Sequence, residues 1–193
     1  MGQSLEVHLS DVAIGQYRLS RAEYDRAIEA GVFEPEARLE LIDGDLHAMT
    51  PQGSRHATGV VLVSESLRRA FGSGFHVRTQ LPLAADDYSE PEPDVAVVTG
   101  TLRDYRDAHP TLPVLVVEVS DDSLHHDRTV KQRLYARCGI PEYWLLALPD
   151  ARLEVYRDPG EGGYRSVSFH GPVDSVAPRG CPDARIAVAD LLP

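Results

Sequence analysis

Lysine is almost absent from this chain. Lys131 is the only one, although lysine and arginine together occupy 19 positions, so arginine supplies every other positive side chain. Lysine is a compact ammonium whose pKa responds to burial, whereas arginine is a planar fork that stays charged. The single lysine is therefore a candidate for a role that arginine cannot fill.

Long apolar runs are also absent. No run approaches the roughly 20 residues of a membrane-spanning helix, and the N-terminus lacks the apolar core of a signal peptide. The two cysteines, Cys138 and Cys181, are distant and lack metal-ligand spacing. We therefore expect free thiols, no membrane partner and a cytoplasmic location.

Positive charge is in deficit, with a net charge of −11 at pH 7. Affinity for nucleic acids comes largely from lysine and arginine displacing counterions, so this charge argues against a generic nucleic-acid binder. A nuclease of this charge needs a divalent metal, assembly into an oligomer, or a local stripe of arginines, for which the candidates are Arg68, Arg69, Arg128, Arg133 and Arg137.

The length of 193 residues favours a single domain, 1–193, with its core at about 20–160. Residues 1–19 show little periodicity and are predicted to form a lead-in strand or a loose arm. Capping, turn and periodicity signals then predict, in order, a helix from the capping box at 20–23 to Gly31, a hairpin of strands 38–42 and 45–49, and a helix at 54–71.

The second half alternates in the same way. The predicted elements are a strand at 75–83, strands opening at Asp94 and spanning 113–119, a helix at 123–138, a strand at 142–148, and a hairpin of 153–156 with 164–169. This order indicates an α/β protein of the α+β type, with a mixed sheet and helices on its faces.

Two acidic residues interrupt neighbouring strand patterns. Asp94 follows Pro93 at a strand entry, and Glu118 lies within an apolar strand, on the face of Val116 and Ser120. A buried carboxylate is costly unless it is paired or binds a metal. Two carboxylates on adjacent strands could hold Mg²⁺. The alternatives are an ordinary acidic loop residue for Asp94 and a solvent-facing strand end for Glu118.

Lys131 shares a helical face with Leu134, Tyr135 and Cys138. It could extend its ammonium to water, as long basic side chains often do. It could instead point at the carboxylate pair and polarise an attacking water or neutralise phosphate charge. The convergence of the three residues favours the second interpretation.

These motifs resemble a family of proteins. The segments Pro93-Asp94, 115–120, 127–131 and 134–144, with weaker support from 40–44, 50–56 and 80–82, resemble a large bacterial endonuclease family of the PD-(D/E)xK, restriction-endonuclease-like superfamily. That resemblance implies an αβββαβ core, here with an extra N-terminal helix and hairpin and a C-terminal β-hairpin. It also implies Mg²⁺-dependent hydrolysis, with Mn²⁺ as a substitute and Asp94 and Glu118 as metal ligands. The superfamily lysine lies two residues after the glutamate, where this chain has Ser120, whereas the family places it on the following helix, as Lys131.

Further residues are candidates for supporting roles. Glu40 is either a third catalytic carboxylate or a surface residue of the hairpin, and His56 is either a general base or a structural histidine. Gln80 could orient a water or the lysine, and Asp127 could pair with Lys131 four residues later.

Three functions remain open from the sequence. The first is a Mg²⁺-dependent endonuclease acting on DNA, with a homodimer presenting two sites to two strands. The second is a catalytically silent structural or protein-interaction module of the same fold, which the acidic charge favours. The third is a metal-dependent phosphodiesterase acting on RNA or nucleotides.

Overall fold

The computed structural model describes residues 17–193 except residues 35 and 50. The predicted arm at 1–19 therefore lies largely outside the described residues. Helix α1 (Arg21–Glu29) begins at the predicted capping box, in which Ser20 and Glu23 cap each other. The hairpin of β1 (Leu39–Ile42) and β2 (Asp45–Ala48) follows, and its turn places Asp43 and Gly44 at positive φ.

The remaining elements form the sheet and its cover. In chain order they are α2 (Ser54–Phe71), β3 (Phe75–Thr79), β4 (Val95–Thr99), η1 (Leu102–Tyr105), β5 (Leu115–Ser120), α3 (Leu124–His126), η2 (Asp127–Lys131), α4 (Gln132–Arg137), β6 (Glu142–Ala147), β7 (Arg152–Gly160), β8 (Gly163–His170), β9 (Ser175–Val176), β10 (Ile186–Ala187) and η3 (Val188–Asp190). The central run from α2 to β6 has the predicted αβββαβ order.

One six-stranded sheet has the order β3-β4-β5-β6-β7-β8. Only β5 and β6 are parallel, because the chain between them crosses over through α3, η2 and α4. The mixed α/β fold class predicted from the sequence is confirmed. Of the helices in the described part of the chain, none has the length and apolarity that a membrane crossing requires.

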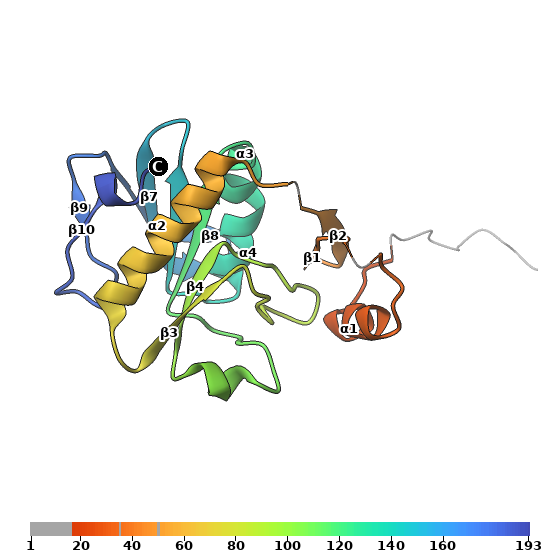
Figure 1. Cartoon of the computed structure of the whole chain (residues 1–193). Coiled ribbons are helices and arrows are strands. Elements are labelled where there is room, and N and C mark those ends of the chain that lie inside the picture. Colours follow the sequence, from red (N-terminus) through yellow and green to blue (C-terminus); the bar gives the residue numbers. More distant parts are fainter. Residues whose placement is uncertain (1–16, 35, 50) are drawn as a thin grey trace, which may run out of the picture.

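The sheet has a hydrophobic core on each face. Val60, Val63 and Leu67 of α2 pack with Val117 and Val119 of β5 on one face, together with side chains of the C-terminal segment. On the other face Leu134 and Tyr135 of α4 pack with Val116 of β5. Figure 1 shows α2 crossing one side of the sheet, with α1 and the β1–β2 hairpin together beside it.

One predicted strand ends early, and one predicted helix contains an internal irregularity. The strand predicted at 75–83 ends at Thr79, because Gln80 adopts a positive φ of 51° and the chain then leaves the ladder before Pro82, which has no N–H to donate. The helix predicted at 123–138 contains a π-helical turn, η2, whose hydrogen bond runs from the Gln132 N–H to the Asp127 carbonyl. A π turn holds one residue more than an α turn, and hydrophobic spacing does not reveal it.

The only tryptophan lies in the middle of the sheet. Trp144 of β6 is fully buried opposite Val117 of β5, and its indole N–H donates to Glu142 Oε1 at 2.9 Å. Glu142 also accepts a hydrogen bond from the backbone N–H of Arg179 at 2.7 Å, which ties the C-terminal segment to the sheet.

Candidate active site

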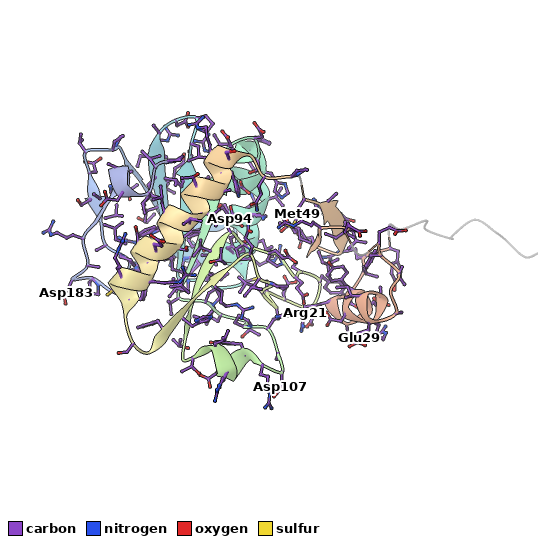
Figure 2. The ribbon with its side chains drawn as sticks, in the orientation of Figure 1. Arg21, Glu29, Met49, Asp94, Asp107 and Asp183 are labelled. Atoms are coloured by element: carbon purple, nitrogen blue, oxygen red, sulfur yellow. The ribbon has the colours of Figure 1, made fainter. Side chains whose placement is uncertain are left out.

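Asp94 and Glu118 lie opposite each other at one end of the β4–β5 pair. The register that pairs Val95 with Val117 brings Asp94, immediately before β4, across from Glu118. The Asp94 N–H donates to Glu118 Oε2 at 3.1 Å, and the Val119 N–H donates to Asp94 Oδ2 at 2.9 Å. Each carboxylate is thus fixed by the backbone of the other strand, on the sheet face that α4 covers. Figure 2 labels Asp94 near the centre of the molecule, with Met49 on the hairpin side of it.

Lys131 joins this pair from η2. Its Nζ lies 3.1 Å from Glu118 Oε1 and 3.1 Å from Glu40 Oε2, and the residue is only 6% exposed. Tyr135, one turn later, donates its hydroxyl to the same Glu118 Oε1 at 2.7 Å. The lysine therefore does not extend to water, because its ammonium lies between two buried carboxylates.

Glu40 reaches the site from the hairpin. It is buried, and its Oε2 accepts a hydrogen bond from the Glu92 backbone N–H at 3.3 Å as well as the Lys131 salt bridge. The hairpin residue is therefore not on the surface. Its contact with Lys131 joins the β1–β2 hairpin to the helix that follows β5.

His56 and Gln80 both contact Asp94. His56 Nε2 lies 3.0 Å from Asp94 Oδ1, and the Gln80 amide donates to the same oxygen at 3.2 Å. The left-handed backbone at Gln80 is unusual for a residue other than glycine, and it occurs where the side chain turns toward Asp94. These two side chains orient the aspartate; neither contacts the lysine through a described hydrogen bond.

Asp127 is buried at the start of the π turn. Its Oδ2 accepts a hydrogen bond from the Ser123 hydroxyl at 2.6 Å, and the Ser123 and Ser120 hydroxyls are 3.1 Å apart. The salt bridges of Lys131 go to Glu40 and Glu118, so Asp127 acts on the lysine through its nearby charge. Ser120, which stands where the motif that the sequence resembles has lysine, belongs to this hydroxyl chain.

Burial and neighbouring charges shift the pKa values of the site residues. Burial raises the pKa of Glu118, and the nearby Lys131 charge opposes that shift. Burial disfavours the charge of Lys131, but Glu118 and Glu40 together hold its pKa above the ordinary lysine value. Burial also raises the pKa of Asp127, while the hydrogen bond to Asp94 raises the pKa of His56.

A cavity of about 280 Å³ opens beside these residues. Its lining contains all of the predicted residues except Gln80, and it contains others that sequence reasoning did not assign: Arg38, His47, Glu92, Asp121, Asp122 and His126. The signal for His47 was present in the sequence, because the hairpin register pairs it with Glu40 and therefore places both on one face.

The arginines proposed as a phosphate-binding stripe either pair with acidic residues or lie outside the cavity lining. Arg128 is bound to Glu154 and Asp150, and Arg137 to Asp43 and Asp86. Arg68, Arg69 and Arg133 do not line the cavity. Within the described residues, the arginine that does line it is Arg38.

A family comparison agrees with this geometry. The sequence profile of the Uma2 family, described as "Putative restriction endonuclease", matches residues 21–189. The chain belongs to the Uma2 family. This membership confirms the restriction-endonuclease-like resemblance and supports nuclease function in general terms. The comparison with curated proteins gives no match.

The Uma2 chain is also similar to a solved structure. The crystal structure of "a putative nuclease belonging to DUF820" from Anabaena variabilis aligns with a TM-score of 0.67 and 18% sequence identity, covering 84% of this chain and 94% of that one. At this identity the similarity establishes the shared fold and leaves the chemistry to the Uma2 chain's own residues.

Proposed function

We propose that this protein is a Mg²⁺-dependent endonuclease that hydrolyses phosphodiester bonds in DNA. The observation that supports the proposal is the convergence of Asp94, Glu118 and the only lysine on one cavity, in a chain of a restriction-endonuclease family. A silent module of the same fold would gain nothing from a buried lysine and carboxylates beside an open cavity.

The donor set suits a hard divalent cation. Among the described residues, no three histidine, cysteine or acidic side chains are grouped closely enough to form a complete metal site. Mg²⁺ does not require such a group, because it usually binds through one or two carboxylates and keeps water and substrate phosphate as its other ligands. Asp94 and Glu118 would hold Mg²⁺ or Mn²⁺, which when bound would polarise the phosphate and lower the pKa of a bound water.

The remaining residues would position these groups. Lys131 would hold the attacking water or stabilise negative charge that develops on the phosphate. Glu40 would fix the ammonium from the hairpin side, while His56 and Gln80 would fix the orientation of Asp94. A homodimer would present two such sites to the two strands of a duplex.

The test is cleavage of supercoiled plasmid and single-stranded DNA with Mg²⁺ or Mn²⁺. We expect Asp94→Asn, Glu118→Gln and Lys131→Ala each to lower the rate by at least about 100-fold. Glu154→Gln is the matched control, since Glu154 is equally buried but lies outside the cavity lining. Calorimetry should show Mg²⁺ binding in the wild type and the control, and none in Glu118→Gln.

Three outcomes would contradict the proposal. Cleavage that persists in the site variants would place the chemistry elsewhere. Cleavage of RNA or nucleotides with no cleavage of DNA would favour the broader phosphodiesterase. A wild type that neither cleaves nor binds metal would be the silent module that the net charge of −11 favours.

A further inference from the structure

The cavity presents an electrostatic problem for a nucleic-acid substrate. Seven of its lining side chains are acidic, and a phosphodiester strand is itself a polyanion. A divalent cation offsets the charge of the carboxylates that hold it, but phosphates beyond it still need hydrogen-bond donors from the protein. The lining must therefore contain donors that the carboxylates do not already occupy.

Two of the basic side chains in the lining are already occupied. The Lys131 ammonium lies between Glu118 and Glu40, and His56 is bound to Asp94. Arg38 lies near Glu92, and its charge opposes the burial that raises the pKa of that carboxyl. His47 and His126 are different: within the described part of the chain, neither imidazole has a hydrogen-bond or ion-pair partner, and each ring contacts the other. Both rings are only partly buried, so their nitrogens can reach a ligand in the cavity.

The two histidines approach each other from separate elements. His47 lies on β2 and His126 at the end of α3, and their ring centroids are 5.5 Å apart with an interplanar angle of 49°. His47 is the cross-strand partner of Glu40 and shares its face of the hairpin. His126 directly precedes buried Asp127. The contacts that build the lysine site thus also bring these two donors to one side of it.

We propose that His47 and His126 form a phosphate-binding subsite, which holds a strand phosphate next to the one that is hydrolysed. This inference rests on the proposed function. Two imidazole N–H groups from facing elements can each donate to a different non-bridging oxygen of a single phosphate. The tilt between the rings favours this mode over insertion of a base between them, for which parallel rings are better suited.

The test compares His47→Ala and His126→Ala with His125→Ala. His125 is the matched control, because it is the neighbour of His126 on the same helix but is exposed and outside the cavity lining. We expect each site variant to raise the KM for DNA cleavage, and the Kd for DNA measured with Ca²⁺ in place of Mg²⁺, by about tenfold. The kcat should change by less than about threefold, and His125→Ala should match the wild type.

A second measurement identifies the phosphate. In wild type, replacing single phosphates of a DNA strand by uncharged methylphosphonate should weaken binding by about tenfold at one position near the cleaved bond. At that position His47→Ala and His126→Ala should lose no further affinity, because the partner of their missing N–H is already gone. Far-UV circular dichroism and thermal unfolding would show that the variants are folded.

The outcomes separate this inference from the proposed function. If wild type cleaves DNA and the two histidine variants keep its KM and Kd, the subsite is wrong and the nuclease assignment stands. If the variants lose kcat with KM unchanged, the histidines act on the chemical step and are not a binding subsite. If wild type neither binds nor cleaves DNA, both proposals fall together.

Discussion

Glu118 and Glu154 occupy the same row of the sheet. Glu118 of β5 is paired with Leu145 of β6, and Leu145 is paired with Glu154 of β7, so both carboxylates point to the same face. They are 3% and 1% exposed. Position and burial do not distinguish them, but the partners of the two carboxylates do.

Glu154 is held mainly by arginine. Arg128 and Arg152 donate to it, as does the Tyr156 hydroxyl at 2.7 Å. Burial opposes its charge, but these donors hold its pKa below the ordinary glutamate value. For Glu118 burial prevails and raises the pKa, although Lys131 counteracts it. A fully paired guanidinium network is a structural arrangement, whereas a carboxylate with a raised pKa beside a lysine and a cavity is suited to chemistry.

The largest difference between the two networks is expected when the type of cation is changed in each, lysine to arginine at 131 and arginine to lysine at 128. Lys131→Arg keeps the positive charge but replaces a compact ammonium with a planar fork that does not fit between Glu40 and Glu118, so we expect DNA cleavage to fall by about 100-fold. Arg128→Lys, the reciprocal change, should leave the cleavage rate unchanged. Plasmid nicking assays measure both, and equal losses in the two variants would show that the two networks do not differ in function.

Removing Arg128 should affect stability and leave chemistry intact. Arg128→Ala takes the largest set of donors from buried Glu154, and Arg152 and Tyr156 compensate only in part, so we expect a loss of about 2–3 kcal/mol in the free energy of unfolding. Urea denaturation measures this loss. The cleavage rate below the unfolding transition should equal that of wild type, and a reduced rate would assign Arg128 to the site.

Glu90 extends the comparison to a buried acid that lacks a close partner. It is 4% exposed, its Oε2 has no hydrogen-bond partner among the described residues, and the nearest cation, Arg21, is 4.0 Å away. Burial raises its pKa to about 7. Glu90 is therefore protonated more easily in the folded state than in the unfolded state. Its contribution to the free energy of unfolding is fully present below the unfolded-state pKa of about 4.5 and is lost as pH rises through about 7.

Glu90→Gln should remove that pH dependence. The amide stays neutral, so between pH 5 and 8 the variant should gain about 1–2 kcal/mol in stability relative to the wild type. Chemical denaturation at several pH values gives the difference directly. If the difference in stability between variant and wild type is the same at every pH in that range, Glu90 has the same protonation state in the folded and the unfolded protein.

The fold was largely predictable from the sequence because local signals and burial agree. The capping box at Ser20, the Asp43-Gly44 turn and the apolar face of residues 54–71 all occur where they were predicted. The short strands β9 and β10 were not found, because two-residue pairings carry no periodicity. The single-domain organisation and the cytoplasmic location stay predictions.

The candidate site was predictable in part. Asp94, Glu118, Lys131 and Glu40 do converge, although their catalytic roles remain predictions. The sequence could not show that Arg128 and Arg137 have acidic partners, because these contacts join residues far apart in the chain. It also missed His126, whose placement depends on how the helix after β5 meets the hairpin.

The buried indole of Trp144 makes the protein its own optical probe. Because this is the chain's only tryptophan, all indole fluorescence comes from β6, the strand beside β5. Trp144 pairs with Val117, the residue that precedes Glu118. A shift of its emission to longer wavelength therefore reports solvent entry into the centre of the sheet, without any label. The same signal can be followed in every variant described above, since none of them changes Trp144.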